Sequence, residues 1–161
     1  VSHNDEEPSD ASIGLAQQVR DTVRTAVQMT RLLEYPGDLS TPQVSVLNTL
    51  SSEPARIGDL AALGGVTQPG MSQLVSRLEG AGLVQRTRSD QDARVTLVEI
   101  TAEGRSALER VNRERNRVLG VHLERLSDEE VRRIRDGLSP LGSLAEDVVR
   151  DLTAGDDNRR R

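Results

Sequence analysis

Apolar residues in the middle of the chain recur at the spacing of a buried helical face. Met71, Leu74, Val75 and Leu78 stand at i, i+3, i+4 and i+7, which predicts an amphipathic helix with one side in a core. The opposite side carries polar side chains, those of Gln68, Ser72, Gln73, Ser76 and Arg77. Side chains of these types suit contacts with base edges and phosphates in a DNA groove, and a solvated helix face is the alternative interpretation.

A shorter helix is predicted immediately before this one. Residues 58–63 form it, and the Gly64-Gly65 pair ends it. Thr67 is the expected cap of the following helix, and Pro69 lies in its first turn, where a missing N–H has little cost. Two short helices joined by a tight turn that contains glycine form a helix-turn-helix.

Extended segments follow the second of these helices. Residues 83–88 and 95–100 are predicted to be two strands of an antiparallel hairpin, with the charged segment 89–94 at its tip. In the second strand we expect Val98 and Ile100 to point inward, because alternate strand residues share a face. A helix-turn-helix followed by a charged hairpin is the outline of a winged helix-turn-helix, in which the hairpin tip is the wing.

Helices are also predicted in front of this unit. Apolar positions step at helical spacing from Ser12 to Leu33, giving a first helix of about six turns that ends at a Pro-Gly pair. Ser40 and Gln43 form a capping box that opens the next helix. Arg56-Ile57 is expected to supply a short extended piece.

Two long helices are predicted behind the hairpin. The first runs from Thr101 to about Leu126, and Ser127 opens the second with another capping box. Pro140 predicts a bend in the last helix. The terminal helices share no core with the middle of the chain, yet each has an apolar face to bury. A second copy of the chain is the economical cover, which predicts a two-fold dimer.

The predicted fold is mainly α (α+β), a winged helix-turn-helix domain with N- and C-terminal helices that form a dimerisation region. The expected organisation is a disordered N-terminal tail at 1–10, a helical dimerisation region at 11–36 and 105–152, a winged helix-turn-helix DNA-binding domain at 39–104, and a disordered tail at 153–161.

Composition excludes several classes of function. The chain has no cysteine, which excludes disulfides, thiolate metal sites and thiol redox sensing. His3 and His122 are the only histidines, so neither a metal sensor nor a Ser/His/Asp enzyme is expected, and no catalytic residue or cofactor is predicted. Apolar runs are too short for a membrane span and the first residues are acidic, which predicts a soluble cytoplasmic protein.

The net charge of −5 is unusual for a protein that binds nucleic acid. The negative charge lies mainly outside the central segment: residues 1–15 have a net charge of −4 and residues 127–161 of −2, whereas residues 67–94 have a net charge of +1. Every one of the 21 basic residues is arginine, which either favours phosphate binding or reflects codon usage. The positive field is weak, so charge alone does not predict DNA binding, and a winged-helix dimer that binds proteins instead remains the alternative.

Fragments spread along the chain resemble the MarR family of bacterial transcriptional regulators, over roughly residues 13 to 150. They are L-S-T-P-Q-x-x-V-L-x-x-L at 39–50, D-L-A at 59–61, G-V-T-Q-P-G-M-S at 65–72, L-V-S-R-L-E-G-A-G-L-V-Q-R at 74–86, D-A-R at 92–94 and I-T-A-E-G at 100–104. The resemblance implies a homodimer on double-stranded DNA, with each recognition helix in a major groove and each wing at the adjacent minor groove. By family habit, repression is the expected mode of regulation.

The resemblance also implies individual contacts. Arg94 matches the arginine of the wing tip and Asp92 the acid that holds it, whereas Ala93 stands where the family often has a second arginine. The positions that match DNA-facing residues of the recognition helix are Gln68, Pro69, Gly70, Ser72, Gln73 and Arg77. The complete set of candidate DNA contacts is Thr67, Gln68, Pro69, Gly70, Ser72, Gln73, Ser76, Arg77, Arg86, Arg88, Asp92 and Arg94.

Members of this family commonly respond to small, often aromatic and anionic ligands held between the dimer helices and the winged domain. Tyr35 is the only aromatic residue, so a stacking pocket is poorly furnished. Arg113 and Arg117, one turn apart on the predicted fifth helix, are suited to an anion, and a solvated arginine face is the alternative. These three residues are the candidate effector contacts.

Overall fold

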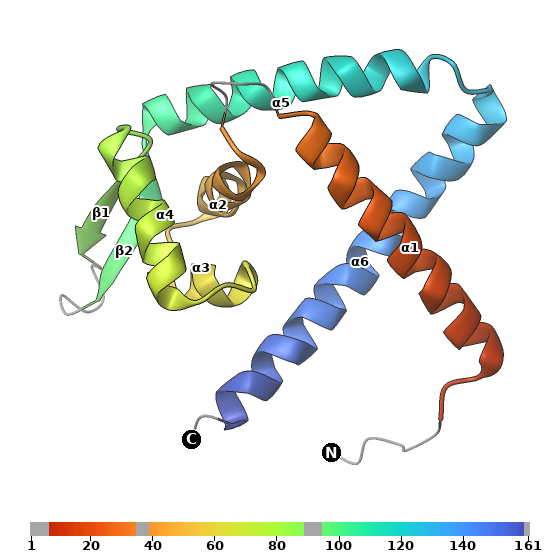
Figure 1. Ribbon diagram of the computed structural model, residues 1–161, viewed down its shortest axis with the longest axis horizontal. Helices are drawn as coiled ribbons and strands as arrows, with labels where there is room; N and C mark the ends of the chain where they lie inside the picture. The colour runs from red at the N-terminus through yellow and green to blue at the C-terminus, as the bar shows by residue number, and fades with distance from the viewer. Residues whose placement is uncertain (1–6, 35–38, 89–94, 160–161) are drawn as a thin grey trace. The chain divides into compact units, whose positions relative to one another are not determined.

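A computed structural model describes residues 7–34, 39–88 and 95–159, with side chains as far as Leu152. The chain divides into two compact units, Val1–Thr41 and Pro42–Arg161. Within the described residues there are six helices and one two-stranded antiparallel sheet (Figure 1). The mainly α fold predicted from the sequence is confirmed.

The first unit is built on helix α1, Asp10–Leu32. Ser9 caps it, because the Ser9 hydroxyl accepts a hydrogen bond from the Ser12 amide at 3.2 Å. The predicted helix of about six turns is confirmed, although it begins slightly earlier than the apolar pattern indicates. No side chain of α1 is buried within the single chain, and Ile13 remains 53% exposed.

Three helices follow α1, and the second and third of them form the predicted helix-turn-helix. They are α2, Thr41–Ser52, α3, Ile57–Leu63, and α4, Gln68–Gly80. The turn between α3 and α4 passes through Gly65 at φ +60°, a left-handed conformation that favours glycine. Thr67 then caps α4 as predicted, since its hydroxyl accepts a hydrogen bond from an amide in the first turn.

The predicted inward face of α4 is confirmed. Met71, Val75 and Leu78 are buried, and Leu74 is half-buried. Together with residues of α2 and the sheet they form the core, whose largest fully buried side chains are Leu47, Leu50, Leu78, Val75 and Val98. Burial of this stripe fixes which side of α4 faces solvent.

The wing is a short hairpin of β1, Val84–Arg88, and β2, Thr96–Ile100, paired in antiparallel register with Val84 opposite Ile100. Both strands agree with the prediction to within one residue at each end. Val98 and Ile100 are buried, as expected from the alternation. The predicted tip, residues 89–94, lies outside the described part of the chain.

A third backbone segment pairs with the hairpin. Ala55 forms an antiparallel bridge with Val98, with N–O distances of 3.1 and 2.8 Å. The expected extended piece at Arg56-Ile57 was therefore placed too late: Ile57 is the first residue of α3 and Arg56 precedes it as the N-cap. The residue that pairs with β2 is Ala55, directly before Arg56.

The end of α4 is tied to the start of α5, Ala102–Leu123. The Thr101 hydroxyl donates to the Gly82 carbonyl at 2.7 Å and accepts from the Gly104 amide at 3.0 Å. The Thr101 amide donates to the Leu83 carbonyl at 3.1 Å. One threonine thus caps α5 and holds the turn that follows α4, which gives a physical reason for the I-T-A-E-G fragment.

The last helix, α6, runs from Asp128 to Arg159 and begins at the predicted capping box. The Glu130 carboxylate accepts hydrogen bonds from the Ser127 hydroxyl and amide, and these bonds hold the pKa of Glu130 below its ordinary value.

Two features of the terminal helices differ from the prediction. Helix α5 ends at Leu123, not at about Leu126. Thr153, the expected start of a polar tail, lies inside α6, whereas the bend expected at Pro140, which lies within the same helix, stays a prediction. The segment after Leu152 is polar but contains no proline, and each added residue extends an existing helix by one more hydrogen bond.

Candidate nucleic-acid interface

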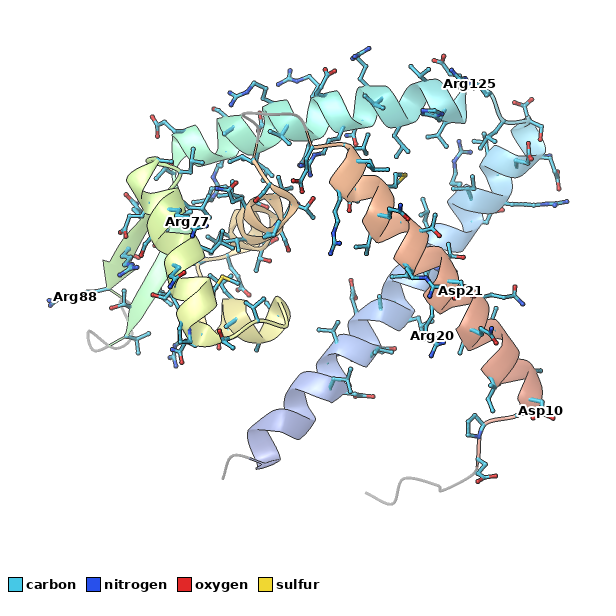
Figure 2. The ribbon with its side chains drawn as sticks, in the orientation of Figure 1. Asp10, Arg20, Asp21, Arg77, Arg88 and Arg125 are labelled. Carbon is cyan, nitrogen blue, oxygen red and sulfur yellow. The ribbon has the colours of Figure 1, made fainter. Side chains whose placement is uncertain are left out.

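The outer face of α4 presents the polar residues that the sequence pattern singles out. Ser72 is half-buried, and the other candidates on or beside this helix are exposed, namely Thr67, Gln68, Pro69, Gly70, Gln73, Ser76 and Arg77. Figure 2 shows Arg77 on this helix. Because the buried stripe lies on the opposite side, amide, hydroxyl and guanidinium groups are displayed on one surface, which is the arrangement needed to reach base edges and phosphates.

Arg86 of β1 contacts α4. Its Nη2 donates a hydrogen bond to Ser76 Oγ at 3.2 Å, and its Nε lies 3.4 Å from Glu79 Oε2. Two candidate DNA contacts, Ser76 and Arg86, are therefore in contact with each other. Sequence reasoning missed this cluster. The signal for it is the spacing in β1: Arg86 stands two residues after the buried Val84, so the two side chains leave the strand on the same face.

Arg88 has different surroundings. It is exposed at the end of β1, and Figure 2 shows its side chain extending away from that end of the strand. Among the described residues, no carboxylate lies within ion-pair distance of it. The charge of Arg88 is thus displayed to solvent, whereas Glu79 offsets that of Arg86.

The wing-tip candidates Asp92 and Arg94 lie outside the described residues, as does Tyr35 of the candidate effector site. The pairing of Asp92 with Arg94 and the part assigned to Tyr35 stay predictions.

The two arginines of the candidate effector site differ in their partners. Arg117 forms an ion pair with Glu114, at 2.7 Å between Nη2 and Oε1, and this hydrogen bond lowers the pKa of Glu114 below its ordinary value. Arg113 is exposed and lines a shallow hollow of α5 together with Glu109, Asn112 and Asn116.

Within residues 7–34, 39–88 and 95–152, no group of three or more histidine or acidic side chains is arranged to hold a metal ion. No helix in that part of the chain is long and apolar enough to cross a membrane.

Comparison with known proteins places the chain among transcriptional regulators. A model of the MarR family matches residues 37–95, the stretch from just before α2 to the wing. The chain is 30% identical over 115 residues to YfiV of Bacillus subtilis, named an uncharacterized HTH-type transcriptional regulator, and the match covers 71% of this chain and 72% of that protein.

Solved structures show the same fold along most of the chain. A MarR family protein from Bacillus stearothermophilus matches with a TM-score of 0.69 and 26% identity, over 87% of this chain and 99% of the other. The transcriptional regulator BldR from Sulfolobus solfataricus matches with a TM-score of 0.64 and 28% identity, over 86% of this chain and 99% of the other.

Proposed function

Because the chain belongs to the MarR family of transcriptional regulators, we propose that it binds a pseudo-palindromic DNA operator as a homodimer and represses transcription from it. The observation that carries the proposal is the two-sided character of α4. Met71, Val75 and Leu78 are buried, whereas Gln73 and Arg77 are exposed on the other side. A helix held in this way presents its polar face as one rigid surface to a major groove.

The chemistry of that face supports specific recognition. Gln68 and Gln73 carry amides, which pair with adenine edges through two hydrogen bonds, and the Arg77 guanidinium pairs similarly with guanine or grips a phosphate. Each good base contact contributes about 1–3 kcal/mol of discrimination. A few such contacts in one subunit give only modest selectivity, so doubling them in a dimer is part of the proposal.

Exposed apolar residues on the terminal helices support the homodimer. On α1, Leu15 is 62% exposed, and on α6, Leu138 is 61% and Leu144 is 48% exposed in the single chain. Continuous apolar stripes of this kind are rarely left in water by soluble proteins. A two-fold partner that covers them also brings two copies of α4 onto one DNA molecule.

We propose further that a small-molecule effector binds the protein and releases it from the operator. Tyr35, Arg113 and Arg117 are its proposed contacts, and Arg113 lines a shallow hollow of α5 that Glu109 also lines.

We expect Arg94→Ala to weaken operator binding by at least about tenfold, the loss that corresponds to roughly 1.4 kcal/mol. The arginine at the hairpin tip is proposed to enter a narrow minor groove, where the negative potential is strongest at A/T steps. Mobility-shift titration measures the loss, and sedimentation checks that the variant is still a dimer. Unchanged affinity would refute the role of the wing.

The proposed function itself is tested by selecting genomic fragments with the purified protein and footprinting the strongest of them. A two-fold dimer predicts two protected half-sites about one helical turn apart, near 10 bp from centre to centre. A single asymmetric half-site would count against the dimeric mode of binding.

A further inference from the structure

The contact between Arg86 and α4 links the two DNA-facing parts of the proposed interface. Ser76 and Glu79, which hold the Arg86 side chain, are three residues apart and therefore neighbours on α4. Arg86 lies on the strand that leads directly into the wing tip. This cluster joins the recognition helix to the wing through side chains.

The surroundings of β1 explain why Arg86 turns toward α4. Gln85 and Thr87, on the other strand face, both donate hydrogen bonds to Glu99 of β2, at 3.4 and 2.9 Å. Arg86 belongs to the alternate face, the same as the buried Val84, and β1 contacts α4 on that side. The direction of Arg86 is therefore set by the pleat of the strand.

We propose that Arg86 is a positioning residue, which orients the wing relative to the recognition helix through Ser76 and Glu79, and that it does not grip DNA phosphate. This inference rests on the proposed function. A helix and a wing that must enter adjacent grooves together gain affinity when their relative orientation is already fixed before binding. Arg88, two residues along the same strand face, is left to contact phosphate because no described carboxylate pairs with it.

Salt dependence distinguishes positioning from phosphate contact. The affinity of each variant is measured over a salt series, both for the strongest selected genomic fragment and for a random-sequence duplex of equal length. For Arg86→Gln we expect about a threefold to tenfold loss on the selected fragment, the effect of one exposed ion pair and hydrogen bond in each subunit. Affinity for random DNA and the slope of log K against log salt should stay unchanged.

Arg88→Gln is the matched control on the same strand face. If Arg88 contacts phosphate, the slope loses about 0.9 per subunit and affinity falls in parallel on both DNA molecules. The same pattern in Arg86→Gln would overturn the positioning role. Arg132→Gln breaks a more exposed ion pair, with Glu129 on α6, and should leave both affinities unchanged.

Glu79→Gln tests the anchor itself. Under the proposal it weakens binding to the selected fragment as Arg86→Gln does, and the double variant is no weaker than Arg86→Gln alone, because both substitutions break one interaction. If Glu79 merely repels phosphate, its removal tightens binding to both DNA molecules, and that result would overturn the inference. Failure of the unmutated protein to bind any DNA would instead overturn the proposed function together with this inference.

Discussion

Replacement of Gly104 by alanine is expected to destabilise the winged domain by about 3 kcal/mol, at the upper end of the usual cost of overpacking. A Cβ at this position would lie 2.0 Å from the Leu83 carbonyl oxygen and 2.8 Å from Cγ1 of Ile100. The carbonyl belongs to the backbone and already accepts a hydrogen bond from the Thr101 amide, so it cannot move without breaking the junction of α4, β1 and α5. Thermal unfolding followed by circular dichroism should show a fall in Tm of roughly 10 °C.

Gly80→Ala is the matched control for this substitution. Gly80 is the last residue of α4, and a Cβ added there would meet no atom within 4 Å. Since alanine is a better helix former than glycine, we expect the control to be neutral or more stable by about 0.5–1 kcal/mol. Equal melting temperatures for the two variants would show that the tight approach of α5 to Leu83 does not limit stability.

The double substitution Leu138→Glu and Leu141→Glu on α6 is expected to separate the proposed dimer and to lower operator affinity at least about a hundredfold. Both side chains are exposed in the single chain, at 61% and 36%, and carboxylates in their place would have to be desolvated in an interface. Two linked half-site contacts bind about 10²–10⁴ times more tightly than either alone, and this gain is lost in a monomer. Sedimentation gives the mass and mobility shift gives the affinity.

Glu146→Gln, an exposed change on the same helix, serves as the control and should remain dimeric with full affinity. A double variant that sediments as a dimer would contradict the interface proposed for α6. A monomer that still binds the operator with full affinity would contradict the dependence of DNA binding on dimerisation.

Those parts of the fold that depend on local periodicity were predictable from sequence. The inward stripe of α4 follows from residue spacing alone, since Met71, Val75 and Leu78 recur at helical intervals whatever covers them. The Thr67 cap and the Ser127 capping box are likewise short-range signals, and the structure confirms both.

Features set by contacts between distant residues were not predictable. The need for glycine at position 104 arises from the carbonyl of Leu83, which lies 21 residues earlier in the chain, just before β1. Arg86 and Arg88 are both arginines on the same face of β1, and the sequence does not distinguish them. Only the packing of β1 beside α4 shows that Arg86 is held by Glu79 while Arg88 is open to solvent. The polar composition after Leu152 predicts a tail, but α6 continues to Arg159, because an established helix extends through residues of modest propensity.

We propose that this acidic protein binds DNA as a dimer through α4 and the wing. The most direct measurement is the affinity of the unmutated protein for random-sequence duplex DNA over a series of salt concentrations. If Arg77, Arg88 and Arg94 of both subunits each neutralise a phosphate, the slope of log K against log salt is about −5, from six contacts at roughly 0.9 each. A slope near zero, or no binding even at low salt, would contradict the account and favour a winged-helix dimer that binds other proteins.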